Sequence, residues 1–149
     1  MRQQYGSSTA YLLQTRLHWT PLPSSDPDAG PKFACRNPTP FADPDDYKIL
    51  KNDWPYGLAE GIVHICVWLK TPISVTPDTG DLTERSREIV GAFVERVFVG
   101  RLREVFGEEA RERALWFKNW TGLQSVRGID HVHVLVRDAP EQVLRDWTR

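Results

Sequence analysis

Cysteine is scarce in this chain of 149 residues, which contains only Cys35 and Cys66. The two form no Cys-x-x-Cys motif, and Cys66 stands within an apolar run, so buried free thiols are expected rather than a disulfide framework. An excess of charge is also missing, because the formal net charge is −1 and neither a polybasic arm nor an acidic tail is present. Proteins that bind nucleic acid usually carry a basic footprint. The sequence therefore predicts no nucleic-acid partner, while a small anionic ligand stays open.

Long hydrophobic runs are lacking as well. The longest uncharged and strongly apolar run covers residues 61–69, far short of the roughly 20 residues that a membrane helix needs. Residues 1–8 do not contain the apolar core of a signal peptide. We therefore expect a cytoplasmic protein that neither spans a membrane nor is secreted.

The length suits one domain over residues 1–149, with a core that forms without metal or disulfide support. Residues 20–47 contain seven of the eleven prolines and five aspartates, a composition typical of an extended, irregular segment. Such a segment is too long for an ordinary connection between elements. We expect it to cover the domain, anchored by Phe33, Phe41 and Tyr47.

The hydrophobic pattern predicts both strands and helices. Alternating or β-branched apolar runs predict strands at residues 48–50, 61–70, 115–118 and 131–136. Apolar residues spaced three and four apart predict a long helix that starts at a capping box in residues 81–84 and ends at Gly107. A terminal helix is expected to open at residues 138–141. This order predicts an α+β fold, with an antiparallel β-sheet and one long packing helix.

Two of only four histidines form the pair His131-x-His133. Alternation along a strand places both imidazoles on one face, and His64 shares a face with Cys66 and Trp68 in an earlier strand. Histidine suits acid–base and nucleophilic roles because its ordinary pKa lies near working pH. The alternative interpretation is that these are surface or hydrogen-bonded core histidines.

A metal site is the other option for these residues. His64, His131 and His133 could supply three nitrogens and leave one position open, as in catalytic zinc sites. However, no acidic residue is expected on their face, because Asp130 should point to the opposite side of the strand. We therefore expect no metal and no cofactor.

The segments around the histidines resemble the histidine-triad superfamily. Val63-His-Ile-Cys-Val-Trp-Leu-Lys-Thr-Pro-Ile73 is similar to its first core strand, and Asn119, Gln124-Ser-Val126 and His131-Val-His-Val-Leu135 are similar to its signature. The resemblance implies a histidine-triad-like fold with His131 as nucleophile and His133 as the last histidine. It also implies that Ser125 touches the phosphate or leaving group and that Asn119 contacts the ligand. Two positions depart from the pattern, since Ile129 replaces the first histidine and Trp68-Leu-Lys70 replaces Ile-Pro-Lys.

A closer resemblance covers nearly the whole chain from Tyr5 onward. It rests on Arg36-Asn-Pro-Thr-Pro-Phe-Ala-Asp43, Ile49-Leu-Lys-Asn-Asp-Trp-Pro-Tyr-Gly57, Ile62-Val-His-Ile-Cys-Val-Trp-Leu-Lys70, Trp116-Phe-Lys-Asn119 and His131-Val-His-Val-Leu-Val136. These segments are similar to a fungal family known as N-acetylglucosamine-induced proteins, largely a domain of unknown function. The resemblance implies a fungal host and leaves the mechanism open.

The remaining candidates are cations, an amide and aromatic rings near the histidines. Lys70 and Lys118 end predicted strands and could orient a phosphate or carboxylate together with Gln124, although solvated charge is the default for lysine. Trp54, Tyr56, Trp68 and Trp116 could wall an apolar substrate, although most large rings belong to the core.

Three hypotheses about function follow. The first is a histidine-triad-like phosphoester or nucleotidyl hydrolase or transferase that acts on a small molecule through His131. The second is a metal-free acid–base catalyst, a cyclase, isomerase or lyase of fungal secondary-metabolite biosynthesis, that uses His131 and His133. The third is a non-catalytic binding or regulatory module. The sequence does not determine the oligomeric state, and a homodimer is compatible with all three hypotheses.

Overall fold

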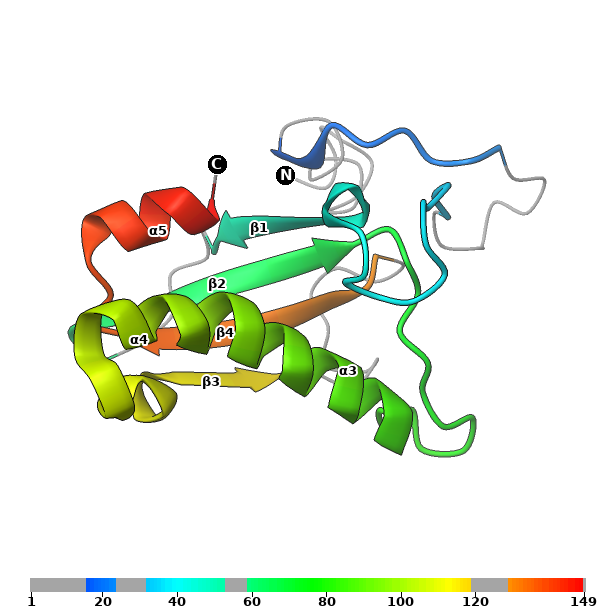
Figure 1. Ribbon diagram of the computed structural model, residues 1–149. Coiled ribbons are helices and arrows are strands. Elements are labelled where there is room, and N and C mark those ends of the chain that lie inside the picture. The colour runs from blue at the N-terminus through cyan, green and yellow to red at the C-terminus, as the bar shows by residue number, and fades with distance from the viewer. Residues whose placement is uncertain (1–15, 24–31, 53–58, 119–128, 149) are drawn as a thin grey trace.

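The computed structural model describes residues 16–23, 32–52, 59–118 and 129–148. Its centre is a four-stranded sheet in the order β1-β2-β4-β3, and every neighbouring pair is antiparallel. The strands are β1 (Tyr47–Lys51), β2 (Ile62–Leu69), β3 (Ala114–Phe117) and β4 (His131–Arg137). This is the antiparallel α+β arrangement that the sequence predicts (Figure 1).

One long helical segment lies across a single face of the sheet (Figure 1). It runs through α3 (Glu84–Val94), a π-helical turn η3 (Glu95–Val99) and α4 (Gly100–Phe106) before the 3-10 helix η4 (Gly107–Arg113). Gly107 adopts a positive φ of 62° at the end of α4, a conformation that glycine tolerates best. The predicted long packing helix is confirmed.

The helix does not begin at the predicted capping box. Its N-cap is Thr83, whose side chain accepts a hydrogen bond from the Ser86 backbone N–H. Ser86 is itself buried and donates its hydroxyl to the carbonyl of Ser74. The prediction of Asp81 as the cap was wrong, because the loop, through the hydrogen bond from the Thr83 N–H to the Ser74 carbonyl, starts the first turn two residues later, at Thr83.

The helix-covered face of the sheet, here called the helix face, carries the main core. Strand residues at alternate positions meet the long helix and the terminal helix α5 (Glu141–Trp147). The most deeply buried members are Ile65, Val67, Leu69, Val90, Phe93, Phe98, Leu102, Val132, Val134 and Val136. Stability is therefore concentrated on this side of the sheet, since burial of large apolar groups is the dominant favourable term in folding.

The described parts of the segment 20–47 reach both sides of the sheet. Phe41 is buried in the helix-face core and stacks on Phe93 with ring centroids 4.1 Å apart. Phe33 belongs instead to a smaller apolar cluster with Leu50 and Trp68 on the opposite face. The aromatic anchors predicted for this segment thus divide between the two faces.

The chain continues from that segment through the short 3-10 helix η2 (Pro44–Asp46) into β1. The buried carboxylate of Asp46 accepts hydrogen bonds from the backbone N–H groups of Arg36 and Asn37. These bonds tie the segment to the start of the sheet.

Among the residues that the structure describes, no helix has both the length and the apolar character needed to cross a membrane.

Candidate functional site

The second face of the sheet, here called the imidazole face, brings the three strand histidines together. The antiparallel register between β2 and β4 pairs Cys66 with His133 and Trp68 with His131. Paired residues of neighbouring strands point to the same side, and His64 lies two positions from Cys66. The predicted cluster of His64, His131 and His133 is therefore present on one face, as the alternation of both strands indicated.

His131 is held in one orientation. Its ring stacks on Trp68 with centroids 4.2 Å apart, and its Nδ1 lies 3.0 Å from the carbonyl oxygen of Ile129. A carbonyl can only accept a hydrogen bond, so Nδ1 carries the proton and Nε2 carries the lone pair. Burial lowers the pKa of His131, which is 2% exposed, and the positive charge of Lys118 lowers it further. The imidazole is therefore neutral near pH 7.

Ile129 is the residue that the resemblance aligns with the first histidine of the histidine-triad pattern. Its side chain is buried in the apolar cluster with Leu50 and Trp68, while its backbone carbonyl accepts a hydrogen bond from His131. Ile129 therefore contacts His131 through its backbone.

His64 and His133 are linked directly. The Nε2 of His64 lies 2.7 Å from the Nδ1 of His133, and the Nδ1 of His64 lies 2.9 Å from the amide nitrogen of Asn52. Because an amide N–H₂ donates, the protons run from Asn52 to His64 and from His64 to His133. His133 then carries its own proton on Nε2, a buried atom without a hydrogen-bond partner in the described part of the chain.

Burial also sets the protonation of these two imidazoles. Burial lowers the pKa of His64. Burial also lowers the pKa of His133, to about 3, and the positive charges that His131, His64 and Lys118 can carry add to this effect. His133 is 6% exposed. Both rings are consequently neutral over the physiological range, because desolvation disfavours the charged form.

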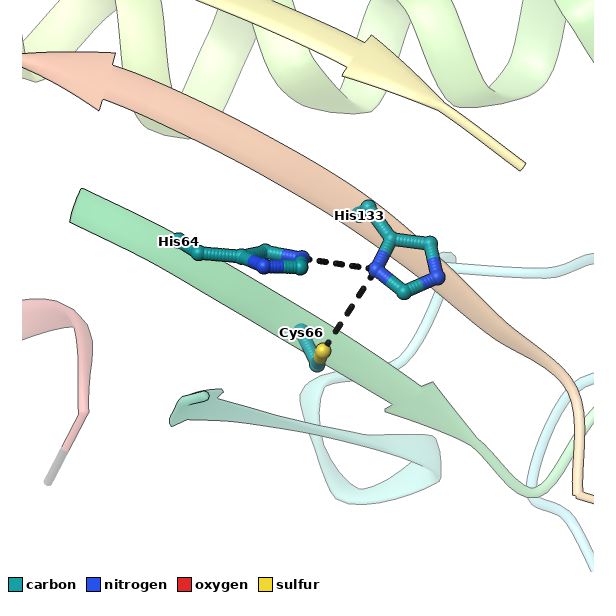
Figure 2. A group of neighbouring side chains, drawn as sticks. All are labelled: His64, Cys66 and His133. Carbon is teal, nitrogen blue, oxygen red and sulfur yellow. Dashed lines mark hydrogen bonds between the residues drawn. The ribbon is translucent and has the colours of Figure 1, made fainter. Parts of the chain in front are cut away.

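Cys66 lies beside this pair and was missed as a site residue. Its Sγ is 3.7 Å from the Nδ1 of His133 (Figure 2), and burial raises the pKa of its thiol to about 12. The sequence predicted it correctly as a buried free thiol, whereas Cys35 is free but exposed rather than buried. The sequence does contain a signal for this position: Cys66 follows His64 by two residues on one strand, and this spacing places both side chains on the same face.

The predicted aromatic wall is only partly on the imidazole face. Trp68 stacks on His131, but Trp116 pairs with Val134 and packs against the helix-face core. The ring that does reach the histidines from β3 is Phe117, which stacks on His133 with centroids 4.8 Å apart and planes 9° apart. Which residue of a short edge strand reaches a given face depends on the register, and this register places Phe117 rather than Trp116 beside the histidines.

The two predicted lysines lie at different places. The side chain of Lys118 is 7% exposed, and its Nζ lies 3.9 Å from a carboxylate oxygen of Asp130. It lines a pocket that also includes Arg87, Trp116 and Phe117. Lys70 lies over the ring of Trp19, 5.4 Å from its centroid, at the margin of the apolar cluster. Lys118 is thus the cation close enough to act on His131 electrostatically.

Five of the predicted site residues fall outside the described part of the structure. They are Trp54, Tyr56, Asn119, Gln124 and Ser125.

Comparison with known proteins identifies the family. Residues 1–137 match the family described as proteins of unknown function, DUF3605, and the chain belongs to this family. It is 30% identical over 140 residues to N-acetylglucosamine-induced protein 1 of Candida albicans, covering 89% of this chain and 53% of that protein. It is 33% identical over 90 residues to an uncharacterized protein of Saccharomyces cerevisiae, covering 60% of this chain and 43% of that protein.

The chain therefore spans about half the length of these curated relatives. Among solved structures, the crystal structure of HTC1 is similar, with a TM-score of 0.66 and 26% sequence identity over 97% of this chain and 77% of that one. The resemblance to the fungal N-acetylglucosamine-induced family is thus confirmed, and the fold is shared with a solved protein.

Proposed function

We propose that this protein is an enzyme that attacks a small phosphoester or nucleotidyl substrate with His131, in the manner of histidine-triad hydrolases and transferases. The observation that carries the proposal is the hydrogen bond of His131 Nδ1 to the Ile129 carbonyl. It fixes the tautomer whose lone pair lies on Nε2, the form that a nucleophilic imidazole needs. Burial keeps this ring neutral, and Trp68 fixes its plane.

The charges near the site support an anionic substrate. The side chain of Lys118 is 7% exposed, its ammonium lies 3.9 Å from a carboxylate oxygen of Asp130, and its positive charge reaches His131. Positive groups at such a place stabilise charge that develops on phosphoryl oxygens in the transition state. The substrate class itself comes from the resemblance of residues 119–135 to the histidine-triad signature.

The proposed reaction has two steps. The Nε2 lone pair of His131 forms a bond to phosphorus, and the bond from phosphorus to the leaving group breaks with its electron pair. The intermediate imidazolium keeps its proton on Nδ1, hydrogen-bonded to the Ile129 carbonyl, which disperses the new charge. Water then attacks phosphorus, and the N–P bond breaks to return neutral His131. One proton of the water stays on the product phosphate, and the other passes through solvent to the leaving group.

The acid–base alternative, a metal-free cyclase, isomerase or lyase of secondary metabolism, receives less support. An efficient general base has a pKa near the operating pH, whereas that of His133 is lowered to about 3. We further propose a cytoplasmic enzyme with a small molecule, and no nucleic acid, as its partner.

Turnover of a nucleotide phosphoramidate and of a dinucleotide tests this function. We expect wild-type protein to hydrolyse at least one of them, and His131→Asn to lower kcat by on the order of 10³-fold, as loss of a nucleophile does. The matched control is His18→Asn. His18 is an exposed histidine with a φ of 57°, and asparagine tolerates this backbone conformation. The control should keep the wild-type rate.

Two results would contradict the proposal. One is the absence of turnover with every nucleotide tested, which would favour the non-catalytic binding module. The other is an unchanged rate in His131→Asn, which would move the chemistry to another residue.

A further inference from the structure

Three metal-binding atoms from two strands converge on one point of the imidazole face. They are the Nε2 of His64 and the Sγ of Cys66 on β2 and the Nδ1 of His133 on β4, and all lie within 4.8 Å of one another (Figure 2). We infer that these three atoms bind one late-transition-metal ion, with Zn²⁺ as the best match. This site goes beyond the proposed function, because His131 is not one of its ligands.

The distances fit a tetrahedral ion after a small adjustment. Zinc bonds of about 2.0–2.1 Å to nitrogen and about 2.3 Å to sulfur place two nitrogens about 3.3 Å apart and nitrogen and sulfur about 3.6 Å apart. The separation of Cys66 Sγ from His133 Nδ1 is already 3.7 Å. The two imidazole nitrogens are 2.7 Å apart, so they must part by about 0.6 Å.

Proton positions explain how the ion enters. In the metal-free protein, one proton lies between His64 Nε2 and His133 Nδ1, where it holds the two rings together. An ion in this position requires lone pairs on both nitrogens and a thiolate on Cys66. The His64 proton therefore moves to Nδ1, and the Asn52 amide turns to accept it with Oδ1. The Cys66 thiol loses its proton, so each bound ion releases one proton to solvent.

The surroundings favour a metal ligand set over simple packing. The Cys66 thiol and the His133 ring are polar groups buried among Leu50, Trp68 and Phe117. Polar groups in apolar surroundings are costly unless they have partners, and a bound ion would be a partner to both. Asn52 behind His64 resembles the outer hydrogen-bond partners that orient metal-binding imidazoles.

The choice of zinc follows from the donor types. Two imidazoles and one thiolate form a borderline-soft set that suits zinc and leaves a fourth position for water or substrate. Copper sites with two histidines and a cysteine add a weak axial ligand, often methionine, and the described ranges contain no methionine. His131 is not assigned as a ligand, because it does not belong to the group of three residues whose ligand atoms converge.

Cobalt titration of the untagged chain, after dialysis against a chelator, tests this inference. We expect one Co²⁺ per chain, a thiolate-to-cobalt absorption band in the near ultraviolet and strong visible bands typical of tetrahedral cobalt. Added Zn²⁺ should remove these bands. Binding in weakly buffered solution should release one proton per ion.

Variants assign the ligands. Cys66→Ser should abolish the near-ultraviolet band and weaken binding by at least about 100-fold, and Asn52→Ala should weaken it by about 10–100-fold. The matched control Cys35→Ser changes the exposed cysteine and should bind as the wild type does. His131→Asn should also bind normally, which separates this site from the nucleophile.

The inference is overturned if the wild type binds neither ion at micromolar concentration. It is equally overturned if Cys66→Ser, shown to be folded by circular dichroism, binds as tightly as the wild type does. Because the readout is binding, these outcomes do not depend on whether any nucleotide is hydrolysed.

Discussion

The two faces of the sheet use the same strands for opposite purposes. On the helix face, Ile65 and Val67 of β2 lie beside Val132 and Val134 of β4 in an apolar core. On the imidazole face, the intervening positions of the same strands carry histidines, a thiol and a tryptophan. Both faces are buried, since His131 and His133 are nearly as inaccessible as the neighbouring Val132 and Val134.

The two faces differ in the physical consequence of burying their side chains. Apolar burial on the helix face stabilises the fold in proportion to the area removed from water. Burial on the imidazole face desolvates groups that prefer water, and so it lowers the pKa of all three imidazoles and raises that of Cys66. A sheet that is anchored on one side can thus hold neutral imidazoles and a protonated thiol on the other.

The largest effect on stability is expected on the helix face, at Phe93. This side chain is 1% exposed and contacts the rings of Phe41, Tyr47 and Phe98. Phe93→Ala should lower the free energy of unfolding by about 3–5 kcal/mol, because it removes a large buried group and leaves a cavity. Urea denaturation measures this change. A loss below about 1 kcal/mol would mean that the helix face is not the main core.

A smaller loss of stability, different in size at each position, is expected when two adjacent residues of β2 are changed. Val67 faces the helices and Cys66 faces the imidazoles. In protein stripped of metal, Val67→Ala should lower the free energy of unfolding by about 2 kcal/mol and Cys66→Ala by about 1 kcal/mol or less, because fewer apolar contacts are lost at Cys66. Equal losses in urea denaturation would remove the proposed difference between the faces.

The smallest effect is expected at Phe117 on β3, which is 37% exposed. Phe117→Ala should change the free energy of unfolding by at most about 1 kcal/mol, the scale of one aromatic pair. The ring nevertheless stacks on His133, so its loss should move the His133 ring proton resonances downfield in NMR spectra. Unchanged resonances would contradict the stacked geometry, and Leu115→Ala, at another exposed position of β3, is the control.

Much of the fold was readable from local patterns. The alternation in residues 61–70 and 131–136 predicted two strands and the faces of their histidines, because successive side chains must point to opposite sides. Apolar spacing predicted the long helix and Gly107 its end. The predicted N-cap was Asp81, whereas the observed one is Thr83. Both residue types can cap a helix, and only the packed loop decides which of them does so.

The site was less predictable, because its contacts join distant segments. Asn52, Cys66 and Phe117 were not assigned to it, and Trp116, which was proposed as a wall of the site, packs against the helix-face core. Each of these assignments depends on strand register, and a shift of one residue would exchange the two faces. Register is set by packing of the whole sheet against the helices rather than by any one strand.

By itself, the sequence determined which residues alternate with which, and hence that His131 and His133 share a face and that Val132 and Val134 share the other. The tertiary structure alone decided that His64 meets His133, that Cys66 lies beside them and that the Ile129 carbonyl orients His131. The physical reason is that a strand's side-chain period is a property of its own backbone, whereas contacts between strands arise only when the sheet pairs and its core packs.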